Sequence, residues 1–325
     1  MKFLVTGGCG FIGSSLVRNL VDKFPESEIH NIDKLTYAAN NSLNSMGSQS
    51  NYFFYKEDIC NYSVLCSLID SIQPNVIFHL AAESHVDNSI RSPYAFINTN
   101  IIGTFNLLEA SKKFCSEHES KSFKFIHVST DEVFGDLPLD EAPFTEISRY
   151  QPSSPYSASK AGSDLLVKAW NRTYDLPAIV TNCSNNYGPF QDSEKFIPTI
   201  IGALNSQKKI PIYGNGMQVR DWLYVGDHAD ALIQIAIKGI AGESYNIGGD
   251  NEISNLDLVS KIIQIYFNGE LDRDELMKHI NFIEDRPGHD KRYAINSSKI
   301  LDDLNWKPST NADENFKKTI EWFKK

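Results

Sequence analysis

A glycine-rich segment near the N-terminus constrains the fold of this chain more than any other feature. Residues 7–13 read Gly-Gly-Cys-Gly-Phe-Ile-Gly and directly follow the apolar residues 3–6. Apolar residues then recur at helical spacing, at Leu16, Val17, Leu20 and Val21. Glycine allows a tight turn and a close approach of backbone to a pyrophosphate, and a helix N-terminus offers N–H groups to that anion. The segment therefore predicts a strand–turn–helix unit that binds a dinucleotide.

A carboxylate follows at the spacing that such a unit requires. Asp33 lies 20 residues after Gly13, at the end of a predicted strand over residues 28–32. A carboxylate at this place can accept hydrogen bonds from the adenosine ribose hydroxyls. It would repel a 2′-phosphate, which favours NAD over NADP, although the neighbouring cation Lys34 could tolerate that phosphate.

Strands and helices alternate in the first half of the chain. Apolar and β-branched runs predict strands at residues 3–6, 28–32, 52–55, 76–80, 124–129 and 178–182. Helical spacing predicts helices near residues 12–23, 63–72, 94–114 and 155–174. This alternation is typical of an α/β fold with a doubly wound parallel sheet, the Rossmann architecture. The polar, Ser/Asn-rich residues 40–51 predict a surface loop.

The pattern changes after Tyr187, where glycine and proline separate shorter segments. We therefore expect two domains. Residues 1–186 form the dinucleotide-binding domain, and residues 187–325 form a smaller, mixed C-terminal lobe that closes over the cofactor crevice. Some helices and strands of the second part are expected to return to the first.

Two polar motifs predict acid/base and redox chemistry. Tyr156 and Lys160 are four residues apart in a predicted helix, so they share one face. The Lys160 ammonium is expected to favour the phenolate of Tyr156, which can take a proton from a hydroxyl while hydride leaves the same carbon. The pair Asp131-Glu132 follows the predicted strand over residues 124–129, and an oxidation alone does not need two further carboxyl groups. Two further carboxyls suggest an additional step such as elimination of water, although a solvated turn is the common alternative.

Composition excludes several other classes of protein. The chain has 31 basic and 41 acidic residues, a formal net charge of −10, and no basic patch, so we expect no nucleic-acid partner. No apolar run approaches membrane-spanning length, and the N-terminus enters a strand directly. The five cysteines are odd in number and lack C-x-x-C spacing. We therefore expect a cytoplasmic protein with reduced thiols, no metal site and no membrane contact.

The sequence resembles the nucleotide-sugar 4,6-dehydratases of the extended short-chain dehydrogenase/reductase superfamily, almost from end to end. Besides residues 7–13, the resemblance is carried by residues 33–36 (Asp-Lys-Leu-Thr), 79–87 (His-Leu-Ala-Ala-Glu-Ser-His-Val-Asp), 127–135 (His-Val-Ser-Thr-Asp-Glu-Val-Phe-Gly), 152–160, 182–189, 220–223 and 285–290. The Ser-Thr-Asp-Glu run is its most specific part. Epimerases of the superfamily share the glycine loop and the Tyr/Lys pair but usually lack the Asp-Glu pair.

The resemblance implies a role for each candidate catalytic residue. Tyr156 would take the C4 hydroxyl proton of a nucleotide-diphosphoglucose while hydride passes from C4 to NAD. Thr130 would hydrogen-bond the same oxygen, and Lys160 would hold the phenolate and the nicotinamide ribose. Glu132 would remove the C5 proton, and a protonated Asp131 would protonate the departing C6 hydroxyl. Hydride would return to C6 and give a 4-keto-6-deoxy sugar.

The resemblance also implies two sets of binding residues. The cofactor set is Gly7, Gly10, Phe11, Ile12, Gly13, Asp33, Lys34, Leu35, Thr36, Asp58, Ile59, Leu80, Ala81, Ala82, Ser84, Thr99, Ser129, Tyr156 and Lys160. For the diphosphate, Arg220 is the first candidate, because its planar fork binds phosphate bidentately. The other substrate candidates are Ser84, Thr130, Asn185, Lys195, Tyr213, Asn255, Asp285, His289 and Tyr293.

Several alternatives remain open at the level of sequence. A sugar-nucleotide 4-epimerase or a non-catalytic NAD-binding protein could share this fold. The base, thymine or uracil, is not determined. The helices over residues 94–114 and 155–174 are apolar on more than one face and need a second partner. The resemblance favours a homodimer with a four-helix interface, and burial within one chain is the alternative.

Overall fold

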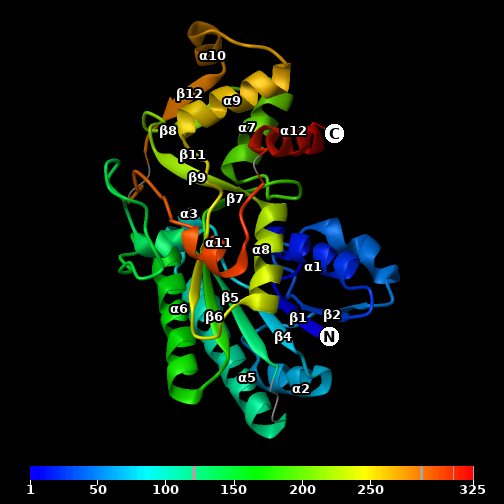
Figure 1. Cartoon of the computed structure of the whole chain (residues 1–325). Helices are drawn as coiled ribbons and strands as arrows, with labels where there is room; N and C mark the ends of the chain where they lie inside the picture. Colours follow the sequence, from blue (N-terminus) through cyan, green and yellow to red (C-terminus); the bar gives the residue numbers. More distant parts are fainter. Residues whose placement is uncertain (119–121, 286–287, 310, 325) are drawn as a thin grey trace.

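The computed structural model describes residues 1–118, 122–285, 288–309 and 311–324 (Figure 1). A seven-stranded sheet lies at its centre, with the order β10-β6-β5-β4-β1-β2-β3 and every neighbouring pair parallel. Its strands are β1 (Lys2–Thr6), β2 (Glu28–Ile32), β3 (Tyr52–Tyr55), β4 (Val76–His79), β5 (Lys124–Thr130), β6 (Ala178–Cys183) and β10 (Ser244–Ile247). This is the doubly wound α/β fold that the sequence predicts.

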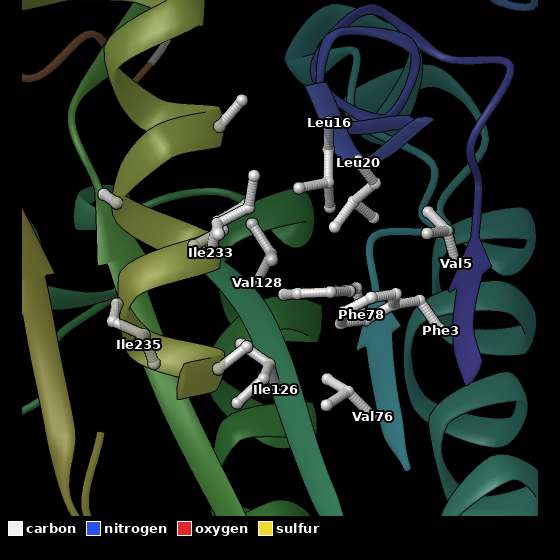
Figure 2. Packing of buried hydrophobic residues seen from close by; sticks show 14 of the residues in the cluster. Phe3, Val5, Leu16, Leu20, Val76, Phe78, Ile126, Val128, Ile233 and Ile235 are labelled. Atoms are coloured by element: carbon white, nitrogen blue, oxygen red, sulfur yellow. The ribbon is translucent and has the colours of Figure 1, made fainter. Parts of the chain in front are cut away.

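Helices cover both faces of this sheet. On one face lie α1 (Phe11–Lys23) and α8 (Val225–Lys238), and on the other lie α2 (Tyr62–Ile72), α5 (Thr104–His118) and α6 (Pro155–Tyr174). Strand residues alternate between the two hydrophobic cores, so that Phe3 and Val5 face α1 and α8 while Leu4 faces α2 and α5. Figure 2 shows the first core, where Leu16 and Leu20 of α1 reach toward the sheet.

A second lobe, at the top of Figure 1, is built from the later part of the chain. It holds a three-stranded sheet of β7 (Asn185–Tyr187), β9 (Val219–Tyr224) and β11 (Glu252–Ser254), and a parallel pair of β8 (Ile210–Tyr213) and β12 (Ile280–Ile283). Its helices are α7 (Phe196–Asn205), α9 (Asn255–Phe267), α10 (Arg273–Lys278) and α12 (Ala312–Phe323). The chain returns to the main sheet through α8, β10 and α11 (Ser298–Leu304).

The predicted loop over residues 40–51 is wrong, because the structure has a 3-10 helix there, η1 (Asn41–Ser48). Asn40 caps this helix by accepting a hydrogen bond from the Ser42 backbone N–H at 2.9 Å. Leu43 and Met46 are buried and join the core beside α1. Two apolar residues at helical spacing therefore outweigh the polar composition of the segment.

The predicted helix over residues 94–114 is divided into three parts. These are α4 (Tyr94–Phe96), the π-helical turn η2 (Ile97–Gly103) and α5. Two short helices complete this half of the chain, α3 (Val86–Arg91) and the 3-10 turn η3 (Asp131–Phe134). Within the described ranges, no helix combines the length and the apolar character that crossing a membrane requires.

Candidate active site

A cavity of about 300 Å³ opens at the carboxyl ends of the central strands. The strand order reverses between β1 and β4, because later strands are added on opposite sides of this pair. Ligands of open α/β sheets bind at such a switch point. The cavity is lined by the glycine segment, by the residues that follow β2 and β4, and by the ends of β5 and β6.

The backbone around Gly7 and Gly13 is packed so tightly that side chains do not fit there. Gly7 has a φ of 73°, and a Cβ there would lie 2.6 Å from the Ala81 backbone nitrogen. A Cβ on Gly13 would lie 2.2 Å from the Gly7 carbonyl oxygen. Helix α1 begins within this segment, at Phe11, and no side chain caps its N-terminus. The first turn of α1 thus presents backbone N–H groups where a pyrophosphate can approach.

Asp33 is held in place by the backbone around it. Its Oδ2 accepts a hydrogen bond from the Cys9 N–H at 2.9 Å, and its Oδ1 accepts one from the Leu35 N–H at 2.8 Å. Each carboxylate oxygen keeps a further lone pair for a ribose hydroxyl. The Lys34 ammonium lies 3.8 Å from carboxylate oxygens of both Asp58 and Glu83, so carboxylates surround the cation that could have received a 2′-phosphate.

Every predicted cofactor residue except Leu35 lines this cavity. Leu35 is 43 % exposed and has a φ of 58°, and its backbone N–H donates to the Asp33 carboxylate. Sequence reasoning missed other lining residues, namely Ile32, Ala38, Ala39, Glu57, Glu83, Val128, Cys183, Ser184, Asn186, Gln191, Asp192 and Glu194. Most of them are neighbours of predicted residues, and their place after a strand end was the available signal.

Four of the five predicted catalytic residues line the same cavity: Thr130, Glu132, Tyr156 and Lys160. Helix α6 brings in the last two. It begins with Pro155 and a capping box in which the Ser154 hydroxyl accepts the Ser157 N–H at 3.1 Å. The helix packs against β5 and β6, which places Tyr156 and Lys160 beside Thr130 at the end of β5.

The expected effect of Lys160 on Tyr156 is wrong in this structure. Burial, followed by the charge of Glu132, raises the pKa of Tyr156 well above its usual value, and the hydrogen bond with Thr130 only partly opposes this. The Lys160 ammonium instead donates a hydrogen bond to the Val128 carbonyl oxygen at 2.9 Å. In this structure the surroundings of Tyr156 therefore favour the neutral phenol over the phenolate.

Asp131 lies behind the cavity wall and is only 2 % exposed. Burial raises its pKa well above the usual value for a carboxyl, and the charges of Glu132 and Asp221 raise it further. Its Oδ1 accepts a hydrogen bond from the Thr130 hydroxyl at 3.3 Å, while its Oδ2 is buried without a hydrogen-bond partner among the described residues. A neutral Asp131 beside the cavity residue Glu132 is the arrangement that an acid/base pair needs.

The predicted substrate residues fall into two groups. Ser84, Thr130, Asn185 and Lys195 line the cavity, and the Lys195 ammonium lies 3.4 Å from the Ser84 carbonyl oxygen. The other six lie outside it, in the second lobe or in the segment after β12: Tyr213, Arg220, Asn255, Asp285, His289 and Tyr293. Arg286 and Pro287, which belong to the motif at residues 285–290, lie outside the described residues.

Arg220 is the centre of the second group. It is 5 % exposed, its guanidinium lies 4.1 Å from the centre of the Tyr293 ring, and it donates to the Asp290 carbonyl oxygen at 2.8 Å. His289 directly precedes Asp290 in the chain, and its Nδ1 lies 2.6 Å from Oδ1 of Asp285. The Arg220 charge lowers the pKa of Asp131 against the effect of burial, so the two groups act on one another electrostatically.

The chain is similar in sequence to known 4,6-dehydratases. The sequence model of the family described as GDP-mannose 4,6 dehydratase matches residues 4–319. A dTDP-glucose 4,6-dehydratase of Shigella flexneri is 50% identical over 99% of this chain and 92% of its own length.

Solved structures show the same similarity. The dTDP-glucose 4,6-dehydratase of Bacillus anthracis in complex with NAD has a TM-score of 0.89 and 42% identity, covering 99% of this chain and 96% of that one. A UDP-glucose 4-epimerase of Thermotoga maritima has a TM-score of 0.87 but only 28% identity, covering 99% of this chain and 98% of that one. The fold is shared with the epimerase, whereas the sequence is much closer to the dehydratases.

Proposed function

The chain belongs to the GDP-mannose 4,6 dehydratase family, and we propose that it is an NAD-dependent dTDP-glucose 4,6-dehydratase. It converts dTDP-glucose into the 4-keto-6-deoxyglucose nucleotide and water. The observation that carries this proposal is the pair of Asp131, buried with a raised pKa, and Glu132, which lines the cavity beside Tyr156 and Lys160. An epimerase needs the Tyr/Lys pair, but it has no use for an additional acid and base.

NAD fits the residues of the cavity. The glycines leave no room for a Cβ where a pyrophosphate approaches, and Asp33 offers its carboxylate to a ribose. When bound, NAD supplies a hydride acceptor and a positive charge that opposes the carboxylates around Tyr156. Tyr156 then takes the C4 hydroxyl proton, Thr130 hydrogen-bonds the same oxygen, and Lys160 orients the phenol and the ribose.

The elimination step belongs to the acidic pair. The 4-keto group acidifies the C5–H, and Glu132 removes that proton. Burial and the charge of Glu132 raise the pKa of Asp131 and so favour its protonated form, which can donate a proton to the departing C6 hydroxyl. After water has left, hydride adds to C6 and Glu132 returns a proton to C5. Glu132 thus serves as the base and Asp131 as the acid, because the two carboxyl groups lie in different environments.

The substrate is proposed to extend from the cavity to the second lobe. The sugar binds next to Ser84, Asn185 and Lys195. The diphosphate binds to Arg220 and its neighbours. This assigns residues 1–186 chiefly to the cofactor and residues 187–325 chiefly to the nucleotide sugar. Thymine and uracil differ by one methyl group, which a pocket distinguishes by about 1–3 kcal/mol, and the names of the relatives favour thymine.

A homodimer is also proposed, through the helices α4 to α6. Part of their apolar surface is used inside the chain, since Phe96, Leu107, Leu108 and Val167 are buried. Another part is exposed, namely Tyr94, Ile97, Ile102, Phe105 and Leu165. A second copy of these helices would cover this surface in a four-helix interface. Light scattering should give twice the chain mass of 36.6 kDa, and a monomer mass would reject the dimer.

A product assay tests the proposed function. The purified protein is incubated with dTDP-glucose and, side by side, with UDP-glucose. We expect loss of water and a 4-keto product that absorbs in alkali, with a higher kcat/KM for dTDP-glucose. A 4-epimer without loss of water would support the epimerase alternative, and no turnover would support a non-catalytic NAD-binding protein.

The free cysteines, two of them buried, fit a reducing compartment such as the cytoplasm.

A further inference from the structure

Asp164 is a buried carboxylate that the proposed reaction does not use. It lies on α6, one helical turn after Lys160 and two turns after Tyr156, on the face that packs against β5 and β6. Its side chain has no exposed surface. Burying a carboxylate is unfavourable unless hydrogen bonds and an opposite charge compensate for the loss of water.

Both oxygens of Asp164 accept hydrogen bonds from the neighbouring strands. Nε2 of His127 on β5 lies 3.1 Å from Oδ1, and Nδ2 of Asn182 on β6 lies 3.3 Å from Oδ2. Burial lowers the pKa of His127 to about 4, so this ring is neutral near pH 7 and carries its proton on Nε2. Nδ1 is buried and has no hydrogen-bond partner among the residues that the structure describes, which fits that tautomer. Neither of these two donors neutralises the charge of the carboxylate.

The charge of Asp164 acts on Lys160. Burial lowers the pKa of Lys160, and Asp164 is the foremost influence that opposes this effect. The other titratable groups that face this region are Lys168 on α6, Tyr150 in the preceding loop, His79 on β4, His127 on β5 and Cys183 on β6. Lys168 donates to the Tyr150 hydroxyl at 3.0 Å. Both histidines are neutral near pH 7, because burial lowers the pKa of each.

Asp164 is also connected, through Asn182, to the end of β5 that carries Thr130. The Nδ2 of Asn182 donates to the Thr130 carbonyl oxygen at 3.1 Å as well as to Asp164. Thr130 is the residue proposed to hydrogen-bond the C4 oxygen, and it is followed directly by Asp131. One carboxylate thus connects the helix that carries Tyr156 and Lys160 to the strand that carries Thr130.

We propose, resting on the dehydratase function above, that Asp164 is a positioning residue for the oxidation at C4. Through Asn182 it fixes the end of β5 that carries Thr130, and its carboxylate compensates the buried ammonium of Lys160. Neither Asp164 nor Asn182 lines the cavity, so both act through residues that do.

The charge is tested with Asp164→Asn, which keeps the shape of the side chain. Without the carboxylate, Lys160 loses its proton more readily, so the alkaline limb of the kcat–pH profile should move down by about one pH unit or more. Ser163→Ala is the matched control. It removes a hydroxyl 3.2 Å from His127 Nε2 but leaves the carboxylate, so the limb should stay in place. An unmoved limb in a folded Asp164→Asn protein overturns the charge compensation.

The mechanical link is tested with Asn182→Ala, which keeps the charge. It should slow formation of reduced cofactor in a single turnover about tenfold or more, because Thr130 is less well placed, while KM and the alkaline limb stay unchanged. A wild-type rate overturns the positioning of Thr130, and this variant decides alone if Asp164→Asn does not fold. The failure of the proposed function looks different, because the wild-type protein would then release no 4-keto product.

Discussion

Asp131 and Glu132 are adjacent in sequence, yet the structure puts them in opposite environments. Glu132 lines the cavity, whereas Asp131 is buried behind it and has a strongly raised pKa. The turn η3 produces this difference, because Thr130 ends β5 and caps the turn by accepting the Glu132 N–H at 3.3 Å. A pair that would repel as two carboxylates can therefore work as an ionised base and a neutral acid.

Glu132→Gln should keep the cofactor and lose the C5 base. We expect turnover to fall at least about a hundredfold, as is usual when a general base is removed. Incorporation of solvent deuterium at C5 measures this step directly. Wild-type exchange in the variant would remove Glu132 from the role of base.

Asp131→Asn should slow the loss of water much more than the oxidation at C4. The amide has nearly the shape of the neutral acid but cannot donate a proton in the way an acid does. Rapid-quench sampling should therefore show reduced cofactor accumulating during turnover. Equal slowing of oxidation and dehydration would mean that Asp131 positions other groups and does not protonate the C6 hydroxyl.

The raised pKa of Asp131 also predicts how stability depends on pH. The folded state keeps this proton over a range in which the unfolded state, with a pKa near 3.8, has released it. The contribution of Asp131 to stability therefore declines as pH rises from about 3.8 toward the raised folded value. Asp131→Asn cannot ionise, so its free energy of unfolding relative to wild type should increase from about pH 4 to about pH 7. A difference that stays constant between these pH values would contradict the raised pKa.

Gly13→Ala should abolish the retention of NAD. Its new Cβ would lie 2.2 Å from the Gly7 carbonyl oxygen, which cannot yield without opening the turn. Gly202→Ala is the matched control, because the Cβ added to this helical glycine of α7 meets no atom within 4 Å beyond its own stretch of helix among the described residues. Bound NAD is measured after denaturation of each purified variant. Full NAD content in Gly13→Ala would show that this turn does not hold the pyrophosphate.

Much of the fold and the cavity follows from local sequence patterns. The strand over residues 28–32, which ends before Asp33, and the helix over residues 155–174 have the predicted bounds, because apolar periodicity and end signals coincide there. In the same way, the glycine segment requires its turn at Gly7 and Gly13, where a Cβ does not fit.

Other properties depend on contacts between distant segments and leave no local signal. Leu43 and Met46 are buried because their segment packs beside α1 and β3. The pKa of Tyr156 is decided by burial and by Glu132, which spacing to Lys160 does not reveal. Asp164 reads in sequence as an ordinary helix residue, and only the packing of α6 on β5 and β6 brings it to His127 and Asn182.

The path of one hydrogen tests the central claim most directly. The protein is given dTDP-glucose that carries deuterium at C4, and the product is examined by NMR. The account predicts deuterium in the C6 methyl group of a 4-keto product, because hydride leaves C4, is held on the cofactor and returns to C6 after water is lost. Deuterium found again at C4, in a product that keeps its C6 hydroxyl, would contradict the dehydratase and indicate an epimerase.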